Sequence, residues 1–199
     1  MDAATEKLIS LIRPGILVGT RELVQAGIPR VALTRAVRRG QIERVARGLY
    51  RLPGRPVSAN ASLAEVARRV PKGVVCLLSA LRFHDLTTQA PFEVWLAIGN
   101  KAAAPKLDYP PLRLVRFSGA ALTEGVEEHA VDGTLVHVTS VAKTVADCFK
   151  YRNKIGLDVA LEALREAWDG RRMTSDEIWH FAKIDRVANV MRPYLESLA

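Results

Sequence analysis

The stretch RVALTRAVRRGQIERVARGLYRLPG, residues 30–54, carries seven arginines and a single acid, Glu43. Its hydrophobic residues recur at regular spacing, which predicts a folded segment rather than a disordered basic tail. A small folded unit has to display these arginines on its surface, where like charges repel one another. A surface of this kind is typical of a segment that binds a polyanion.

The excess positive charge of the chain is confined to its first quarter. The 199 residues have a net charge of +8. Residues 1–55 contain eleven basic and four acidic side chains, whereas residues 56–199 contain 18 basic and 17 acidic ones. This asymmetry predicts a polyanionic partner for the first segment alone.

Residues that cap and end helices divide the first segment. Apolar residues at helical spacing predict a helix over residues 3–13. Thr20 is expected to be the N-cap of a second helix, which Gly27 ends. Pro29 suits the first turn of a third helix, which ends at Gly40.

A hairpin is expected after these helices. Short strands are predicted at residues 42–46 and 49–52, with Arg47-Gly48 as the turn between them. Two helices joined by a short glycine turn and followed by a hairpin predict a winged helix-turn-helix. Residues 1–55 are therefore expected to form a DNA-binding domain.

Residues 56–199 are expected to form a second domain that mixes strands and helices. Ser62 and Glu65 fit a capping box at the start of a helix. The stretch VVCLLSALRFHDL, residues 74–86, is long enough to favour one buried helix over a strand.

The remaining patterns complete this second domain. Alternating residues predict strands at FEVWLAIG and LRLVRF, and Asp132-Gly133 predicts a hairpin turn. Ser140 and Thr174 begin helical stretches, and the chain ends on a helix. The chain is thus predicted to be an α+β protein. It would have an N-terminal winged helix-turn-helix and a mixed α/β C-terminal domain with a small sheet and a helical C-terminus.

The third helix is the candidate recognition helix. A helical wheel turns four apolar residues toward the first two helices: Val31, Leu33, Ala36 and Val37. The opposite face crowds arginines at i, i+3 and i+4, which costs about 0.2–0.5 kcal/mol per pair in isolation. A DNA duplex supplies the anion that offsets this repulsion, and a helix of this size fits its major groove.

The order of residues along this helix suggests their roles. The N-terminal residues of a recognition helix normally reach base edges. Arg30, Thr34 and Arg35 are therefore the expected base contacts. Arg38 and Arg39 lie at the other end of the helix and are the expected phosphate contacts.

Two further groups complete the predicted DNA-binding set. Arg44, Arg47 and Arg51 on the hairpin are expected to enter the minor groove or to lie on the DNA backbone. Thr20 and Arg21 begin the second helix and are expected to contact phosphate.

Two other interpretations of the basic stretch remain open. A solvated basic face explains the charge but not the helix-turn-helix spacing around it. RNA binding is favoured by aromatic side chains that stack on bases. The stretch holds only Tyr50 of this kind, and strand alternation turns Tyr50 toward the core.

Candidate catalytic residues are few and poorly arranged. Ser140 and Lys143 match S-x-x-K, but the companion S-D-N and K-T-G motifs are absent, and Ser140 is equally explained as an N-cap. Ser79, His84 and Asp85 are catalytic-triad residue types on one predicted helix, where their spacing does not direct the serine at the histidine.

No metal or cofactor site is predicted, and the chain is expected not to be an enzyme. The four histidines have no partners at zinc spacing, and no glycine-rich phosphate loop is present. Glu124, Glu127 and Glu128 lack the acidic and lysine partners of a nuclease site. Cys76 and Cys148 fit either two buried thiols or a disulfide.

Three motifs, in order along the chain, suggest a family. The first comprises Arg39, Gly40, Ile42, Arg44, Arg47, Gly48, Leu49 and Tyr50. The second comprises Ser79, Ala80, Leu81, His84, Leu86, Thr87 and Pro91, with Asp85 where glycine is usual. The third is HVTSVAKTVADCFKYRNKIGLDVALEAL. Over roughly residues 5–170 the chain resembles AbiEi-type antitoxins of type IV toxin–antitoxin, or abortive-infection, systems.

The resemblance implies a DNA-binding antitoxin in two parts. The winged helix would bind inverted repeats in the promoter of its own operon and repress it. The second part would neutralise a toxin, usually a nucleotidyltransferase-like protein encoded next door.

Two alternatives from other classes are a ligand-sensing winged-helix regulator without a toxin partner and a DNA-targeted nuclease or hydrolase. A cytoplasmic location without a membrane partner is also expected. The sequence has no run of about 18 apolar residues and no signal peptide.

Overall fold

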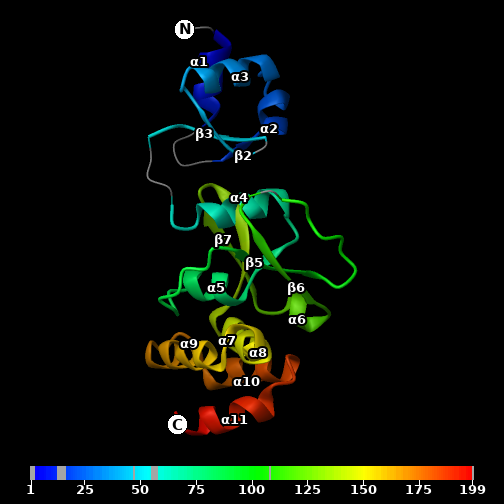
Figure 1. Cartoon of the computed structure of the whole chain (residues 1–199), viewed down its shortest axis with the longest axis vertical. Coiled ribbons are helices and arrows are strands. Elements are labelled where there is room, and N and C mark those ends of the chain that lie inside the picture. Colours follow the sequence, from blue (N-terminus) through cyan, green and yellow to red (C-terminus); the bar gives the residue numbers. More distant parts are fainter. Residues whose placement is uncertain (1–2, 13–16, 47, 55–57, 108, 199) are drawn as a thin grey trace. The chain divides into compact units, whose positions relative to one another are not determined.

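The structure is a computed structural model that describes residues 3–12, 17–46, 48–54, 58–107 and 109–198 (Figure 1). The described residues form helices and two β-sheets, so the predicted mixture of helices and strands is confirmed. Contacts divide the chain into two compact units, residues 1–69 with 130–135 and residues 70–129 with 136–199. The expected functional domains, 1–55 and 56–199, stay a prediction.

The first unit packs short helices around a small apolar core. Its described elements are α1 (Ala3–Leu11), β1 (Val18–Gly19), α2 (Thr20–Gln25), α3 (Arg30–Arg38), β2 (Glu43–Ala46), β3 (Leu49–Arg51) and α4 (Ala61–Arg69). Tyr50 packs against the core, as strand alternation predicts. The buried core side chains are Leu8, Ile12, Leu23, Ile28, Leu33, Ala36 and Ile42.

Glycines end α2 and α3 in the same way. Gly27 has a φ of +85° and Gly40 a φ of +67°, which glycine adopts without steric cost. Beyond α2, the Ile28 N–H donates to the Leu23 carbonyl oxygen at 2.9 Å, and an equivalent bond follows α3. These bonds satisfy carbonyl groups at the helix ends and let the chain turn at once. Both predicted helix ends are confirmed.

A three-stranded antiparallel sheet follows the order β1-β3-β2. Tyr50 on β3 lies between Val18 of β1 and Arg44 of β2. The register shifts between Arg44 and Ala46, where β2 contains a bulge. The predicted hairpin is confirmed in its described residues, whereas β1 was not predicted, because two residues are too few to show a period.

Thr20 is not the N-cap of α2, contrary to expectation; Gly19 is. The Gly19 N–H donates to Glu22 Oε2 at 3.1 Å. Thr20 donates its N–H at 2.8 Å and its hydroxyl at 3.2 Å to the Gly48 carbonyl oxygen. The pairing of Gly19 with Leu49 brings the start of α2 against the hairpin, which no local pattern reveals.

Two predictions for residues 62–86 are wrong. Ser62 lies inside α4, which begins at Ala61, so it does not form a capping box there. The stretch 74–86 is not one helix, because its first residues form the strand β4 (Val74–Val75) before α5 (Leu77–Phe83) begins. Pairing with two neighbouring strands decides this, and a buried apolar run is compatible with either structure.

The second unit is built on a five-stranded mixed sheet in the order β6-β5-β4-β8-β7, whose β7–β8 tip belongs to the first unit. Its strands are β4, β5 (Val94–Gly99), β6 (Leu112–Phe117), β7 (Val126–Val131) and β8 (Thr134–Thr139). The helices after α5 are α6 (Ala120–Thr123), α7 (Val141–Lys150), α8 (Arg152–Ile155), α9 (Leu157–Asp169), α10 (Ser175–Ile184) and α11 (Ala188–Glu196).

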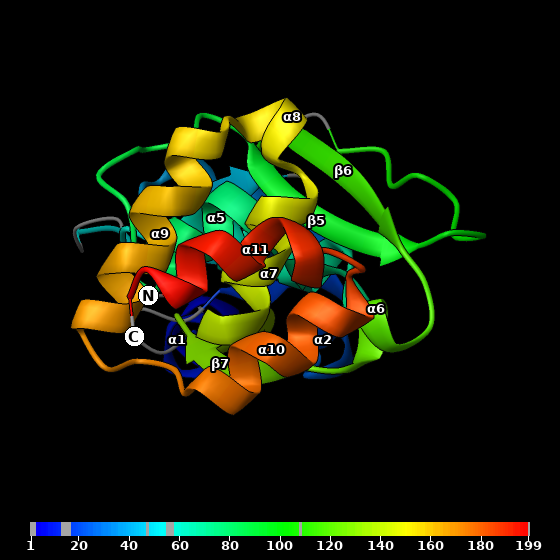
Figure 2. The same cartoon turned by 90° about the horizontal axis from the view of Figure 1, so that it is seen from below.

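Helix α7 is buried along most of its length. Helix α7 contacts α5, α8, α9 and α10. Figure 2 shows α7 to α11 grouped together, with β6 to one side of them. Among the described residues, no helix has the length and apolar character needed to cross a lipid bilayer.

Local signals after residue 130 agree with the structure at three places. Asp132 and Gly133 have φ values of +47° and +69° and form the turn between β7 and β8. Ser140 is the N-cap of α7, and its hydroxyl accepts from the Lys143 N–H at 3.4 Å. Thr174 caps α10 in the predicted capping box.

Candidate nucleic-acid interface

Helix α3 has an apolar face and, on its opposite side, a basic face. Leu33 and Ala36 are buried in the core of the first unit. The exposed side chains of the helix and its C-cap include all the predicted helix contacts: Arg30, Thr34, Arg35, Arg38 and Arg39.

Val31 lies on the exposed face of α3, which corrects the prediction that it turns toward the first two helices. Its side chain is 61% exposed, and Ala32 packs against the core instead. The helix is rotated so that Leu33 and Ala36 are central to the buried face. The sequence pattern is compatible with either rotation, because both residues 31 and 32 are apolar.

The arginines of α3 have no ion-pair partner within the described part of the chain. Arg30, Arg35, Arg38 and Arg39 take part in none of the ion pairs there, and neither does Arg21 on α2. An arginine side chain carries five N–H donors in a planar fork, which suits phosphate oxygens and guanine edges. These five guanidinium groups can therefore bind an anion without breaking an ion pair.

The two threonines of the predicted set are already hydrogen bonded. The Thr34 hydroxyl donates to the Arg30 carbonyl oxygen at 3.3 Å. The Thr20 hydroxyl donates to the Gly48 carbonyl oxygen at 3.2 Å. Each hydroxyl has one proton to donate, so in this arrangement it can only accept a further hydrogen bond. A base amino group fits that role, whereas a phosphate oxygen does not.

The hairpin arginines differ from one another. Arg51 forms an ion pair with Glu43, with its Nε and Nη2 both 2.8 Å from Glu43 Oε2. The two residues are register partners on β3 and β2, so the pair follows from the hairpin itself. Arg44 is exposed on β2. Arg47 lies outside the described residues.

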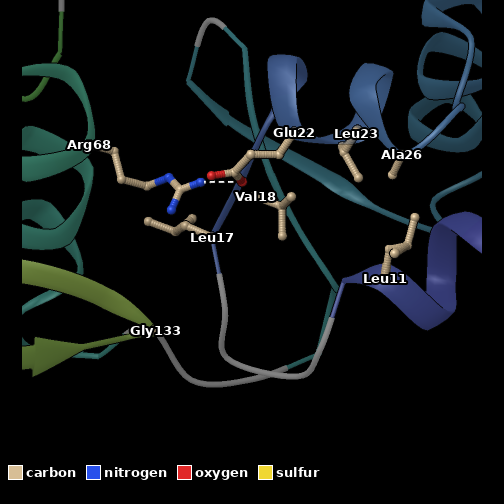
Figure 3. A pocket seen from close by; sticks show the side chains of 8 residues that line it. All are labelled: Leu11, Leu17, Val18, Glu22, Leu23, Ala26, Arg68 and Gly133. Atoms are coloured by element: carbon tan, nitrogen blue, oxygen red, sulfur yellow. Dashed lines mark hydrogen bonds and ion pairs between the residues drawn. The ribbon is translucent and has the colours of Figure 1, made fainter.

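A pocket of about 300 Å³ lies beside α2 in the first unit (Figure 3). Glu22 Oε2 accepts from Arg68 Nη2 at 2.5 Å, so the two charged groups of its lining neutralise each other. The rest of the lining is mainly apolar. The lining residues are Leu11, Leu17, Val18, Glu22, Leu23, Ala26, Arg68 and Gly133.

The triad residue types of the second unit do not meet. The Ser79 hydroxyl accepts from the Trp95 N–H at 2.9 Å. His84 Nε2 lies 2.7 Å from the Thr139 carbonyl oxygen, so this nitrogen is the donor. Burial lowers the pKa of His84, and its bond to the Thr139 carbonyl opposes this shift. Asp85 is exposed, at the end of α5.

The S-x-x-K lysine belongs to a buried ionic cluster. Lys143 Nζ contacts Asp147 Oδ1, lies 3.4 Å from Asp185 Oδ2, and has no solvent exposure. Lys150 Nζ lies 3.2 Å from Asp185 Oδ1. Burial raises the pKa of Asp147 well above its usual value, and Lys143 opposes the shift. The lysine therefore ties α7 to the end of α10 and does not activate Ser140.

This cluster was not among the predicted sites. The i, i+4 spacing of Lys143 and Asp147 on an amphipathic helix was the available signal. Asp185 lies 42 residues from Lys143, so only the packing of α10 on α7 reveals it.

The remaining candidate residues form neither a metal site nor a disulfide among the described residues. Among the residues that the structure describes, no group of three or more His, Cys, Asp or Glu side chains could hold a metal ion. Cys76 and Cys148 are both buried and free, which decides between the two alternatives left open by the sequence.

Comparison with known proteins supports the fold and identifies its first segment. The crystal structure of the RV2827C protein from Mycobacterium tuberculosis is similar, with a TM-score of 0.63 and 14% sequence identity, over 92% of this chain and 72% of that one. At this identity the likeness concerns the fold alone. No curated protein matches the chain in sequence.

Residues 6–53 match the family model described as "Transcriptional regulator, AbiEi antitoxin". The matched segment contains α2, α3 and the hairpin, together with all ten predicted DNA-binding residues. The resemblance inferred from the sequence is thereby confirmed for residues 6–53, which match the family of AbiEi antitoxins and transcriptional regulators.

Proposed function

We propose that this protein is a DNA-binding antitoxin that represses its own operon. The first unit would act as a winged helix-turn-helix, with α3 as the recognition helix and the β2–β3 hairpin as the wing. The observation that carries the proposal is the exposed face of α3. It bears Arg30, Arg35 and Arg38, none of which has an ion-pair partner in the described part of the chain. The family match over residues 6–53 supports a DNA-binding regulator.

The proposed complex places α3 in the major groove of a DNA duplex. Arg30 and Arg35 would read base edges near the start of the helix, and Thr34 would accept from a base amino group. Arg38 and Arg39 would bind phosphates, and Arg21 would do so from the start of α2. Arg44 and Arg47 would extend this contact along the wing.

DNA binding is tested with the full chain and a labelled fragment of the promoter of its own gene. An unrelated fragment of equal length and base composition is the control. We expect preferential binding to the promoter, with an affinity that falls steeply as salt is raised. Equal affinity for both fragments would contradict specific binding to the operator. Binding that does not depend on salt would contradict an electrostatic contribution from the arginines.

The antitoxin role is proposed for residues 56–199. It is supported by the family description of the first segment and by the sequence resemblance over later motifs. A toxin encoded next to this gene, of the nucleotidyltransferase-like class, would be the partner, and the chain itself would have no catalytic activity. Co-expression tests this role: the neighbouring gene should be toxic alone and harmless with the full chain. The role would be contradicted if the full chain gave no protection, or if the product of the neighbouring gene were not toxic.

A ligand-sensing regulator is the second candidate, and the pocket beside α2 is the observation that favours it. A small apolar ligand there would contact Leu23, which shares α2 with Arg21, and Ala26, the C-cap of that helix. A small-molecule pocket of about this volume is at the lower end of the usual range. Thermal shifts of the full chain with a library of apolar metabolites would detect such a ligand.

A further inference from the structure

Val31 occupies the centre of the exposed face of α3. An α-helix turns by about 100° per residue, which places Val31 roughly 140° to 200° around the axis from Ala36 and Leu33. Those two side chains are buried, so Val31 points away from the core and is 61% exposed. Thr34 and Arg35 follow one turn later on the same side.

An exposed valine is by itself ordinary on a protein surface. Val31 differs in its surroundings, because the exposed side chains beside it on α3 are arginines and one threonine. It is also a β-branched residue in the first turn of a helix, where a straight-chain polar residue is a better helix former. The side chain therefore contributes neither to the core nor to the charge of this face.

The major groove of DNA offers such a side chain one apolar group, the C5 methyl of thymine. We propose that Val31 is a specificity-determining residue that packs against a thymine methyl in the site recognised by α3. This inference rests on the proposed DNA-binding function. It adds a hydrophobic contact to a surface that otherwise recognises DNA through charge and hydrogen bonds.

The position of Val31 also limits where this thymine lies. Val31 and Arg35 are four residues apart, a rise of about 6 Å along the helix. Base pairs are stacked about 3.4 Å apart along the duplex. If Arg35 contacts a guanine, the thymine that Val31 contacts lies within about two base pairs of it.

Deoxyuridine substitution tests the contact at the level of one methyl group. Full-length protein first selects its preferred sites from random duplex DNA. Each thymine of a selected site is then replaced in turn by deoxyuridine, which removes only the C5 methyl. We expect that replacing one particular thymine in each half-site weakens binding about fourfold. This is the change in affinity that corresponds to the burial of one methyl group.

The matching protein variant is Val31→Ala. It should bind the thymine site more weakly than the wild type and should bind the thymine and deoxyuridine sites equally. Val24→Ala is the matched control, because Val24 is an exposed valine on α2, 43% exposed, in the same unit. The control should keep the fourfold difference between thymine and deoxyuridine.

The outcomes separate the inference from the function on which it rests. Sequence-selective binding by the wild type, with no thymine that responds to deoxyuridine, would overturn the role of Val31 and leave DNA binding intact. A fourfold response that persists in Val31→Ala would do the same. Failure to select any DNA site would overturn the proposed function, and the inference with it. Thermal unfolding of each variant confirms that it is folded.

Discussion

Glu43 and Arg51 face each other on β2 and β3, and their side chains form an ion pair at 2.8 Å. From the sequence, Arg51 is predicted to be one of the basic, DNA-binding residues of the wing. The structure shows its charge balanced by the single acid of the basic stretch. Arg51 therefore differs from the arginines of α3, for which the described residues offer no such partner.

Releasing Arg51 should strengthen DNA binding. We expect Glu43→Gln to bind DNA more tightly and to raise the salt slope by about one phosphate contact, because the guanidinium becomes able to bind phosphate. Glu6→Gln is the control, since it makes the same charge change at an exposed position on α1. Equal gains in the two variants would mean that only net charge matters. Titrations at several salt concentrations measure the slopes.

Arg35→Ala should reduce sequence discrimination. If Arg35 reads a base, the loss on the preferred site is about 1–3 kcal/mol, with a smaller change on unrelated DNA. Arg165→Ala, an exposed arginine on α9, is the control and should leave both affinities unchanged. Equal losses on preferred and unrelated DNA would reassign Arg35 to a phosphate contact.

Arg38→Ala should weaken binding to all sequences to a similar extent. A phosphate contact carries no sequence information, and its loss lowers the salt slope by about one unit. The measurement is the same salt titration on preferred and unrelated duplexes. An unchanged slope with a loss confined to the preferred site would show that Arg38 reads a base.

Lys143→Met should destabilise the second unit strongly. It removes the buried cation shared by Asp147 and Asp185, which are both buried, and breaking a buried ion pair in this way costs about 3–5 kcal/mol. Denaturant unfolding measures the change. Lys150→Met is the matched control, because Lys150 contacts the same Asp185 but is 35% exposed and should matter less.

A second variant keeps this prediction testable if Lys143→Met fails to fold. Lys143→Met combined with Asp147→Leu removes both a buried cation and its nearest carboxylate. It should regain much of the lost stability, because an apolar pair of similar size avoids the desolvation cost of buried charges. A double variant less stable than Lys143→Met would contradict this account.

The folded protein should lose stability in mild acid through His84. Burial lowers the pKa of His84, so folding favours its neutral form. The stability linked to this histidine is present above the unfolded pKa of about 6.5 and is lost as the pH falls through the lower folded value. Denaturant unfolding between pH 7.5 and about pH 5 measures the decline.

His84→Gln should flatten part of this decline, because glutamine does not titrate and its amide can still donate to the Thr139 carbonyl. His180→Gln is the control, since the His180 side chain is 56% exposed. An unchanged pH dependence in His84→Gln would exclude His84 as its source.

Patterns of local origin predicted much of the fold. The helix ends at Gly27 and Gly40, the turn at Asp132-Gly133 and the cap at Ser140 each depend on a few adjacent residues. Such signals remain readable in a sequence, because the backbone geometry they require is decided within one turn of chain.

Features that depend on residues distant in the sequence were predicted wrongly or not at all. β4 is a two-residue strand whose identity comes from pairing with β5 and β8, and its sequence alone suits a buried helix equally well. Gly19 replaced Thr20 as the cap of α2 because strand pairing brings Gly48 to the Thr20 hydroxyl. In the ionic cluster, Asp185 reaches Lys143 only through the packing of α10 on α7.

The sequence by itself determined that the basic charge belongs to one short folded segment and that a helix carries much of it. Composition and helical period suffice for that, because both are properties of neighbouring residues. The tertiary structure alone decided which side chains of this segment face outward with unpaired charge. It paired Arg51 with Glu43 and turned Val31 into solvent, because strand register and helix rotation are fixed by contacts between segments.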